Sequence, residues 1–352
     1  MDALAEAGIY LALDVNTPKY SIRQDKPGPS YNAKYLQSIF STIDQFEKYS
    51  NTLLFFSGNE VINDVKTSAA APYVKAVTRD MKQYMGNRKY RAIPVGYSAA
   101  DIDDNREEAA HYFNCGTDDE RSDFFAFNDY SWCDPSDYKT STYEEKVKAF
   151  SDYSIPIFLS EFGCVKTKRK FGEIAAIYGT KMTPVYSGGL VYEYSVEGDS
   201  TQSKYGLVDI KDDRSEQDDF KTLSDALSKA KPPSGDGGYK TDGKASVCPD
   251  RSSTWLVKDD KLPAMPPKAS KYFNNGAGEG PGLSGDGSQE AGAESPGTAS
   301  AGSGEPTSTG KSKGKSSSSS AASGVRVPEF QMAPVLCGIV VIISSMVGAA
   351  LL

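Results

Sequence analysis

Two glutamates stand directly after hydrophobic runs that have the length and composition of buried strands. Glu60 ends the run Leu-Leu-Phe-Phe-Ser-Gly-Asn-Glu, and Glu161 ends Pro-Ile-Phe-Leu-Ser-Glu. Where parallel strands curl into a barrel, side chains at their carboxyl ends meet at the barrel mouth. Two carboxyl groups there suit glycoside chemistry, because one protonates the leaving oxygen while the other attacks or stabilises the anomeric carbon. A single such glutamate would fit a charge near the next helix start equally well, so it is the pair that indicates catalysis.

Polar and aromatic residues accompany the two glutamates. Asn59 precedes the first and could donate a hydrogen bond to a sugar 2-hydroxyl, a contact that strengthens in the transition state. Tyr130 and Trp132 follow one apolar run, and Tyr192 and Tyr194 lie on the last. Sugar rings stack on aromatic faces, and a tyrosine hydroxyl can orient a carboxylate. Each aromatic alone fits a core position, but together they favour a carbohydrate site.

Charge and composition exclude several other classes of function. The net charge is −8 and the isoelectric point about 5.0, which disfavours nucleic-acid binding. The single histidine, His111, rules out a two-histidine zinc site and has no Gly-x-Ser-x-Gly motif to complete a serine triad. The cysteines show no Cys-x-x-Cys spacing either. We therefore expect carboxylate chemistry without metal or cofactor.

The elements that must position these residues alternate between short apolar runs and amphipathic stretches. This rhythm predicts repeated βα units around a parallel sheet. Six units are visible where a closed (β/α)8 TIM barrel has eight, so we expect an incomplete TIM barrel over residues 1–231. An open doubly wound sheet is the alternative, but its Gly-rich phosphate loop is missing. The predicted strands cover residues 9–15, 52–57, 92–97, 124–128, 155–160 and 189–194, and the predicted helices residues 33–49, 72–85, 105–112, 143–152 and 171–182.

The remaining chain has a different composition. Residues 232–324 are rich in Gly, Ser, Pro, Ala and Lys, which predicts a linker that is low in complexity and disordered beyond about residue 275. Residues 325–352 combine a polar spacer with a terminal apolar run and follow a stretch of small residues. This is typical of a GPI-attachment signal, with the attachment residue between Ser320 and Gly324. A tail-anchored transmembrane helix is the alternative, although no Lys or Arg follows the apolar run.

The amino terminus and the cysteines bear on secretion. Residues 1–8 resemble the end of a helix rather than a signal peptide, so we expect the chain to be the carboxyl-terminal part of a longer protein. Cys337 lies in the apolar tail, and the other four cysteines allow three disulfide pairings. We favour Cys133–Cys164, which would join two successive strand ends, with Cys115–Cys248, which would hold the start of the linker to the domain.

Long motifs in one order resemble the fungal β-1,3-glucanosyltransferases of glycoside hydrolase family 72. The resemblance extends from about residue 7 to residue 208 and does not include the cysteine-rich carbohydrate-binding module that some members carry. The motifs are YLALDVNTPK at 10–19, FSGNEVIN at 56–63, APYVKAVTRD at 71–80, IPVGYS at 93–98, RSDFFAFNDYSWC at 121–133, SEFGC at 160–164 and SGGLVYEY at 187–194.

The resemblance implies an activity and a set of residue roles. Members cut a β-1,3-glucan internally with retention and pass the donor segment to the non-reducing end of another glucan, at the cell surface and on a GPI lipid. A retaining endo-β-1,3-glucanase and a catalytically inactive glucan-binding wall protein are the alternatives. By resemblance Glu60 is the proton donor and Glu161 the nucleophile. The implied glucan-binding positions are Asn59, Tyr192, Asp101, Arg106 and the loop of residues 18–26 with Tyr20, to which the residue pattern adds Tyr130.

Overall fold

The computed structural model describes residues 1–197, 204–210, 214–257, 261–292 and 297–307 of the 352-residue chain. The predicted attachment signal, residues 325–352, and its attachment residue lie outside these ranges. Within the described ranges, no helix combines the length and the apolar character that crossing a bilayer requires.

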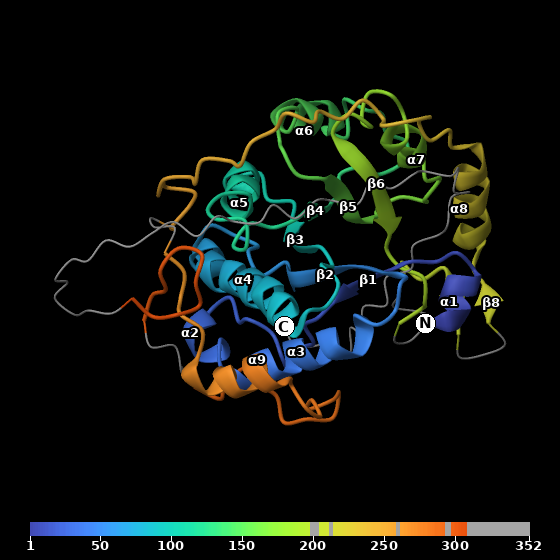
Figure 1. The fold of residues 1–352 in the computed structure, drawn as a ribbon. Coiled ribbons are helices and arrows are strands. Elements are labelled where there is room, and N and C mark those ends of the chain that lie inside the picture. The colour runs from blue at the N-terminus through green and yellow to red at the C-terminus, as the bar shows by residue number, and fades with distance from the viewer. Residues whose placement is uncertain (198–203, 211–213, 258–260, 293–296, 308–352) are drawn as a thin grey trace.

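Six parallel strands form one curled sheet in the order β1-β2-β3-β4-β5-β6, so each strand is hydrogen-bonded to its neighbour in sequence (Figure 1). This arrangement is a half-barrel and confirms the prediction of an incomplete TIM barrel. All six predicted strands are present, although the last begins at Tyr186 rather than at residue 189. The strands are β1 Leu11–Asp14, β2 Thr52–Asn59, β3 Val95–Ala100, β4 Phe125–Asn128, β5 Ile157–Phe162 and β6 Tyr186–Val191, and β7 Val208–Asp209 pairs with β8 Ser215–Glu216 outside the sheet.

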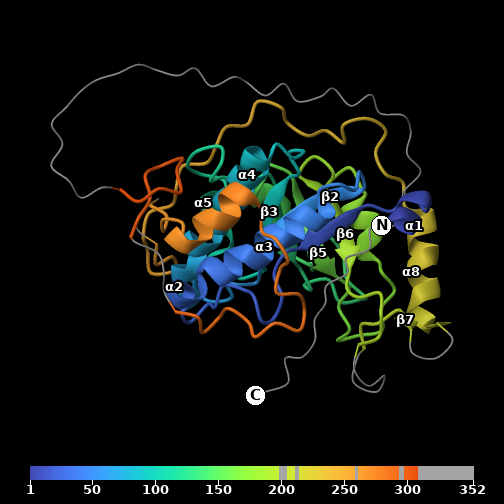
Figure 2. The same cartoon turned by 60° about the horizontal axis from the view of Figure 1, so that its bottom comes forward.

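Helices cover the outer face of the half-barrel (Figures 1 and 2). Each of the five predicted helices is present, and the longest begin where local sequence favours a start. The Asn32 side chain caps α3 by accepting a hydrogen bond from the Tyr35 amide at 3.1 Å, and Pro72 occupies the first turn of α4. The helices are α1 Asp2–Glu6, α2 Pro27–Ser30, α3 Ala33–Phe46, α4 Ala71–Arg88, α5 Arg106–Phe113, α6 Tyr143–Ala149, α7 Glu173–Ile177, α8 Asp218–Lys229 and α9 Ser270–Asn275, with 3-10 turns η1 Lys66–Ala70 and η2 Pro267–Ala269.

The strands bury apolar side chains on both faces, which is why they form continuous apolar runs in the sequence. Phe55 belongs to the large outer core between strands and helices, whereas its neighbour Phe56 belongs to a small inner cluster. In that cluster Phe124 packs edge-on against Phe56, with ring centroids 5.4 Å apart. The half-barrel interior is thus filled with side chains below the level of the polar residues at the strand ends.

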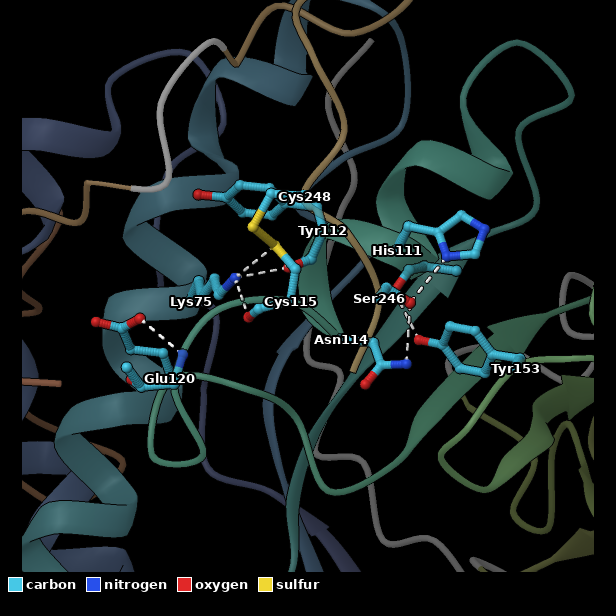
Figure 3. The surroundings of a disulfide bond; sticks show 11 residues. Lys75, His111, Tyr112, Asn114, Cys115, Glu120, Tyr153, Ser246 and Cys248 are labelled. Carbon is cyan, nitrogen blue, oxygen red and sulfur yellow. Dashed lines mark hydrogen bonds between the residues drawn. A yellow bond between two sulfur atoms is a disulfide. The ribbon is translucent and has the colours of Figure 1, made fainter. Parts of the chain in front are cut away.

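Both favoured disulfides are present. Cys133–Cys164 joins the segments that follow β4 and β5, and Cys115–Cys248 ties the chain after α8 to the end of α5. Figure 3 shows the second bond, where the buried Lys75 ammonium donates to the Tyr112 and Cys115 carbonyl oxygens, each at 2.7 Å. The first of these contacts satisfies one of the last carbonyls of α5, and the second satisfies the carbonyl of the disulfide cysteine itself.

The segment after residue 231 differs from the expected linker over much of its described length. Trp255 is completely buried and packs against Tyr112 at a centroid distance of 5.4 Å. Helix α9 lies along α3 and α4 (Figures 1 and 2), and the Phe273 ring packs edge-on against Phe40 and tilted against Tyr84. A few large apolar residues are enough to hold a Gly-rich segment against the domain, because burying their side chains is favourable. The average composition of the segment does not reveal these few residues.

Candidate active site

Glu60 lies immediately after β2, at the mouth of the half-barrel. Its backbone has a φ of 50°, a left-handed conformation that costs a non-glycine residue energy and is concentrated at functional sites. The Glu60 amide donates to the Ser98 carbonyl oxygen of β3 at 2.9 Å, so the residue is held although it is outside the strand. The carboxyl group accepts a hydrogen bond from the Asn128 side chain, 2.9 Å from its Oε1.

Asn128, the last residue of β4, is a functional candidate that the sequence analysis did not single out. Its Nδ2 also donates to the Asn59 side-chain oxygen at 3.0 Å, so one amide orients both residues of the Asn-Glu pair. Its own Oδ1 accepts from the Ser98 and Ser160 hydroxyls, at 3.1 and 2.8 Å, which fixes its rotamer. The only available signal was its position at a strand end, the rule that identified the glutamates.

Glu161 lies within β5, and its carboxylate faces Tyr130. The Tyr130 hydroxyl donates to Glu161 Oε2 at 2.6 Å. Burial raises the pKa of Glu161 to about 7, the Tyr130 hydrogen bond opposes that rise, and the charges of Glu60 and Glu193 add to it. Tyr130 lies two residues after Asn128, the donor to Glu60, so one short segment contacts both carboxyl groups.

Three tyrosines surround the Glu161 side of the mouth. The Tyr192 ring lies 6.4 Å from that of Tyr130 and 5.3 Å from that of Tyr205, all edge to face. Tyr130 and Tyr205 are 5.7 Å apart. Burial, with the neighbouring Glu161, raises the pKa of the Tyr130 hydroxyl above its usual value, so this group remains a proton donor. Tyr205 was not anticipated, because it lies in the loop between β6 and β7.

A cleft of about 1080 Å³ opens beside Glu60 and Asn59 along the β1 edge. Asp14, the last residue of β1, lines it, and burial raises the Asp14 pKa to about 6. Asn16 bonds Asp14 through its backbone and side-chain nitrogens, both at 2.8 Å, and accepts from Tyr35 at 2.6 Å. Asp14 is a third strand-end carboxyl group that the same sequence rule could have found.

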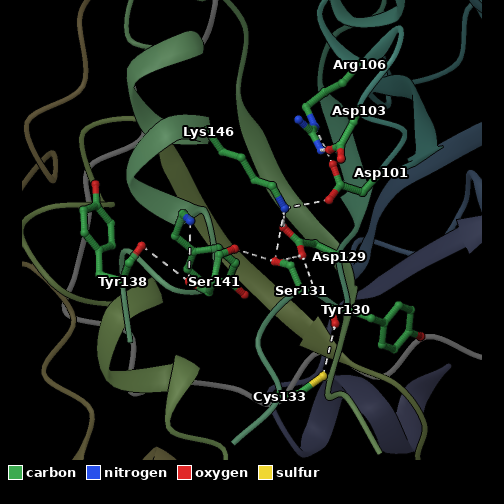
Figure 4. Close-up of polar contacts among 11 residues, drawn as sticks. Asp101, Asp103, Arg106, Asp129, Tyr130, Ser131, Cys133, Tyr138, Ser141 and Lys146 are labelled. Carbon is green, nitrogen blue, oxygen red and sulfur yellow. Dashed lines mark hydrogen bonds and ion pairs between the residues drawn. The ribbon is translucent and has the colours of Figure 1, made fainter. Parts of the chain in front are cut away.

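Asp101 and Arg106, two of the implied glucan-binding residues, belong to a charge network at the ends of β3 and β4 (Figure 4). Arg106 pairs with Asp101 and Asp103, and the nearly buried Lys146 ammonium lies 2.6 Å from Asp101 and 2.5 Å from Asp129. Arg106 lines a separate depression of about 540 Å³ rather than the cleft beside Glu60. The positive charges here are thus already engaged by carboxylates.

Tyr20, another implied glucan-binding residue, is only 3% exposed. Its hydroxyl accepts a hydrogen bond from the Gly287 amide at 3.1 Å. The rest of its loop does reach the cleft, since Thr17, Pro18 and the 21–25 stretch line it. Trp132 is 7% exposed and donates to Asp134 at 3.1 Å, and it too lies in the core rather than on the site surface.

A curled parallel sheet with paired carboxyl groups at its mouth and tyrosines around them defines a barrel enzyme that acts on glycosidic bonds. The comparisons with known proteins make the class definite. A family model described as glucanosyltransferase, that of glycoside hydrolase family 72, matches residues 1–231. This chain therefore belongs to the family 72 glucanosyltransferases.

Individual relatives agree with this assignment. The 1,3-beta-glucanosyltransferase gel1 of Aspergillus fumigatus is 60% identical over 353 residues, covering 100% of this chain and 77% of its own length. The 1,3-beta-glucanosyltransferase GAS5 of Saccharomyces cerevisiae is 55% identical and has 57% of its length covered. The structure of Saccharomyces cerevisiae Gas2p in complex with laminaripentaose superposes with a TM-score of 0.70 at 38% identity, over 76% of this chain and 60% of that one.

Proposed function

We propose that this chain acts as a 1,3-β-glucanosyltransferase. It would cut β-1,3-glucan internally with retention and transfer the donor segment to the non-reducing end of a second glucan. The observation that carries the proposal is that one short segment contacts both carboxyl groups, since Asn128 donates to Glu60 and Tyr130, two residues later, donates to Glu161. The names of the relatives and the laminaripentaose bound to Gas2p, a β-1,3-linked glucose oligomer, support the choice of substrate.

Both glutamates act in each of the two chemical steps. In the first, Glu161 attacks the anomeric carbon while protonated Glu60 gives its proton to the leaving oxygen, and the reducing-side fragment departs. In the second, Glu60 takes the proton of an acceptor hydroxyl, and that oxygen displaces Glu161 to form a new β-1,3 bond. Asn128 orients Glu60 for both proton transfers, and Tyr130 holds the Glu161 carboxylate.

The contacts with sugar follow the same geometry. Asn59 and Tyr192 would contact the donor sugar, and the carboxyl group of Asp14 would accept from its hydroxyls in the adjoining cleft. Transfer prevails over hydrolysis only if an acceptor sugar occupies the mouth ahead of water. Tyr130 and Tyr205, with ring centroids 5.7 Å apart, offer an aromatic surface for such an acceptor.

Product analysis with a reduced β-1,3-gluco-oligosaccharide tests the function. We expect products both shorter and longer than the substrate, and none from the Glu60→Gln or Glu161→Gln variants. Products that are only shorter would instead make the enzyme an endo-β-1,3-glucanase. Binding without turnover would make it a glucan-binding protein.

Trapping with a 2-deoxy-2-fluoro glucoside tests which glutamate is the nucleophile. The fluorine slows breakdown of the glycosyl-enzyme, so mass spectrometry of proteolytic peptides should place the label on Glu161. A label on Glu60 would exchange the two roles while leaving the proposed reaction intact.

We also propose that a GPI lipid holds the protein at the cell surface. The composition of residues 316–352 supports this, and the disulfides Cys115–Cys248 and Cys133–Cys164 suit an oxidising compartment. Phosphatidylinositol-specific phospholipase C should release the protein from fungal membranes. A protein that stays in the detergent phase after this treatment would favour a transmembrane anchor.

A further inference from the structure

The Gly-rich segment of residues 280–290, here called the strap, lies against the loop of residues 17–25 that lines the cleft. Five polar contacts join strap and loop. The Ser288 amide donates to the Lys19 carbonyl oxygen at 2.9 Å, and the Gly287 amide donates to the Tyr20 hydroxyl at 3.1 Å. The others are Lys19 Nζ to the Gly285 carbonyl oxygen at 3.2 Å, Gln289 Nε2 to Ser21 Oγ at 2.6 Å, and an ion pair between Arg23 and Glu290.

Steric contacts explain why glycine occupies several positions of the strap. A Cβ on Gly285 would collide with the Tyr20 hydroxyl, and one on Gly280 would collide with the Ser41 hydroxyl of α3. Gly287 has a φ of 89°, and a Cβ there would lie 3.0 Å from the Lys19 carbonyl oxygen. The backbone of the strap therefore approaches the loop and α3 so closely that only glycine fits at these positions. The contact is thus sterically complementary.

The strap also contributes to the cleft itself. Leu283 lines the same cleft as Asn59 and Glu60, and it is 76% exposed. The cleft has a volume of about 1080 Å³, and Thr17, Pro18 and residues 21–25 of the loop line it as well. An exposed leucine on its wall offers an apolar surface to the C–H face of a pyranose ring.

We propose that the strap is a wall of the glucan-binding cleft, with Leu283 as a specificity-determining residue that contacts a glucose unit remote from the two catalytic carboxyl groups. The strap holds the 17–25 loop in place. Leu283 contributes binding energy only to those β-1,3-glucans that are long enough to reach it. This inference rests on the proposed function. It assigns to the post-barrel segment a role in chain-length preference.

Kinetics with reduced β-1,3-gluco-oligosaccharides of increasing length test the role of Leu283. Leu283→Ala should raise KM about three- to tenfold for the long substrates, with kcat unchanged, and leave the short ones unaffected, because it removes uniform binding at a remote contact. The matched control is Ser284→Ala, a neighbouring exposed position. If the two variants behave alike at every length, the proposal is wrong.

Gly285→Ala tests the strap as a whole, since the added Cβ must displace it from Tyr20. We expect the same length-dependent rise in KM, larger than that of Leu283→Ala, and thermal unfolding shows whether the variant still folds. If Gly285→Ala folds and its kinetics are unchanged, the strap does not form a wall of the glucan-binding cleft. A wild-type protein that binds long glucan in calorimetry, with a loss in Leu283→Ala, but makes no products would contradict the proposed transfer and leave this inference standing.

Discussion

Glu161, the proposed nucleophile, illustrates how a buried carboxyl group can oppose the stability of its own fold. Its pKa rises from 4.5 to about 7 because burial disfavours the charged form. In the unfolded chain this group ionises near 4.5, so between these pH values the folded state binds more protons than the unfolded one. The contribution of Glu161 to the free energy of unfolding is therefore fully present below pH 4.5, where the group is neutral in both states. It is lost as the pH rises through about 7.

Glu161→Gln should therefore stabilise the protein above pH 7. The amide cannot ionise, so the gain in unfolding free energy grows from pH 4.5 to about 7 and then levels off, at no more than about 3 kcal/mol. Urea unfolding at a series of pH values measures it. The matched control is Glu279→Gln, at an exposed position. A constant difference across the series would mean that Glu161 is not buried as described.

Asn128 makes a second prediction at the residue scale. Asn128→Ala removes the donor to Glu60 and Asn59, so kcat/KM should fall about 10- to 100-fold through misorientation of the acid/base group. Ser160→Ala is the matched control, because Ser98 continues to donate to Asn128 Oδ1. Steady-state kinetics with melting temperatures separate the effects. Equal losses in both variants would argue against a specific role for the Asn128 amide.

At the scale of elements, the connection after β4 is held from two sides. The Asp129 amide donates to the Glu161 carbonyl oxygen at 2.8 Å, and the Asp129 carboxylate accepts from the buried Lys146 of α6. Tyr130, which holds the Glu161 carboxylate, is the next residue, and Cys133 continues the segment into its disulfide with Cys164. Helix α6 thus supports the segment that carries Tyr130 through a buried ion pair.

Lys146→Met should cost about 3 kcal/mol of unfolding free energy, because it leaves Asp129 buried without its cation. The exposed Lys148→Met in the same helix is the control. The double variant Lys146→Met with Asp129→Asn should recover part of the loss, which chemical denaturation measures. If Lys146→Met unfolds no more easily than the control, the ion pair does not support this connection.

At the scale of the whole molecule, the chain after α8 returns across the half-barrel and completes its surface. Cys248 ties it near α5, and Trp255 inserts beside Tyr112. Helix α9 then packs on α3 and α4 before the strap reaches the cleft. A segment with the composition of a linker thereby becomes part of the folded unit.

Trp255→Ala tests this integration. Removing a completely buried indole should cost about 3–5 kcal/mol, through lost burial and the cavity left behind. The control Val247→Ala, at a position 89% exposed, should be neutral. Differential scanning calorimetry compares the two. A neutral Trp255→Ala would show that the segment is a linker after all.

The sequence predicted the half-barrel and the two glutamates because both depend on local patterns. Apolar runs of strand length alternate with amphipathic stretches, and a carboxylate directly after such a run lies at the mouth whatever its distant neighbours are. The pairing of Cys133 with Cys164 followed from the same local order of strand ends. Each of these inferences needed only neighbours in the chain.

Tertiary structure decided which distant residues meet. Asn128 became the link between Glu60 and Asn59 because β2 and β4 lie on either side of β3 and their end residues meet above it. In the same way, Arg106 became engaged with Asp101 and Asp103. The burial of Trp255 depended on a groove built by other segments. Such contacts depend on the shape of the folded surface against which each side chain packs. Composition and periodicity do not determine that shape, because it is formed by segments that are distant in the chain.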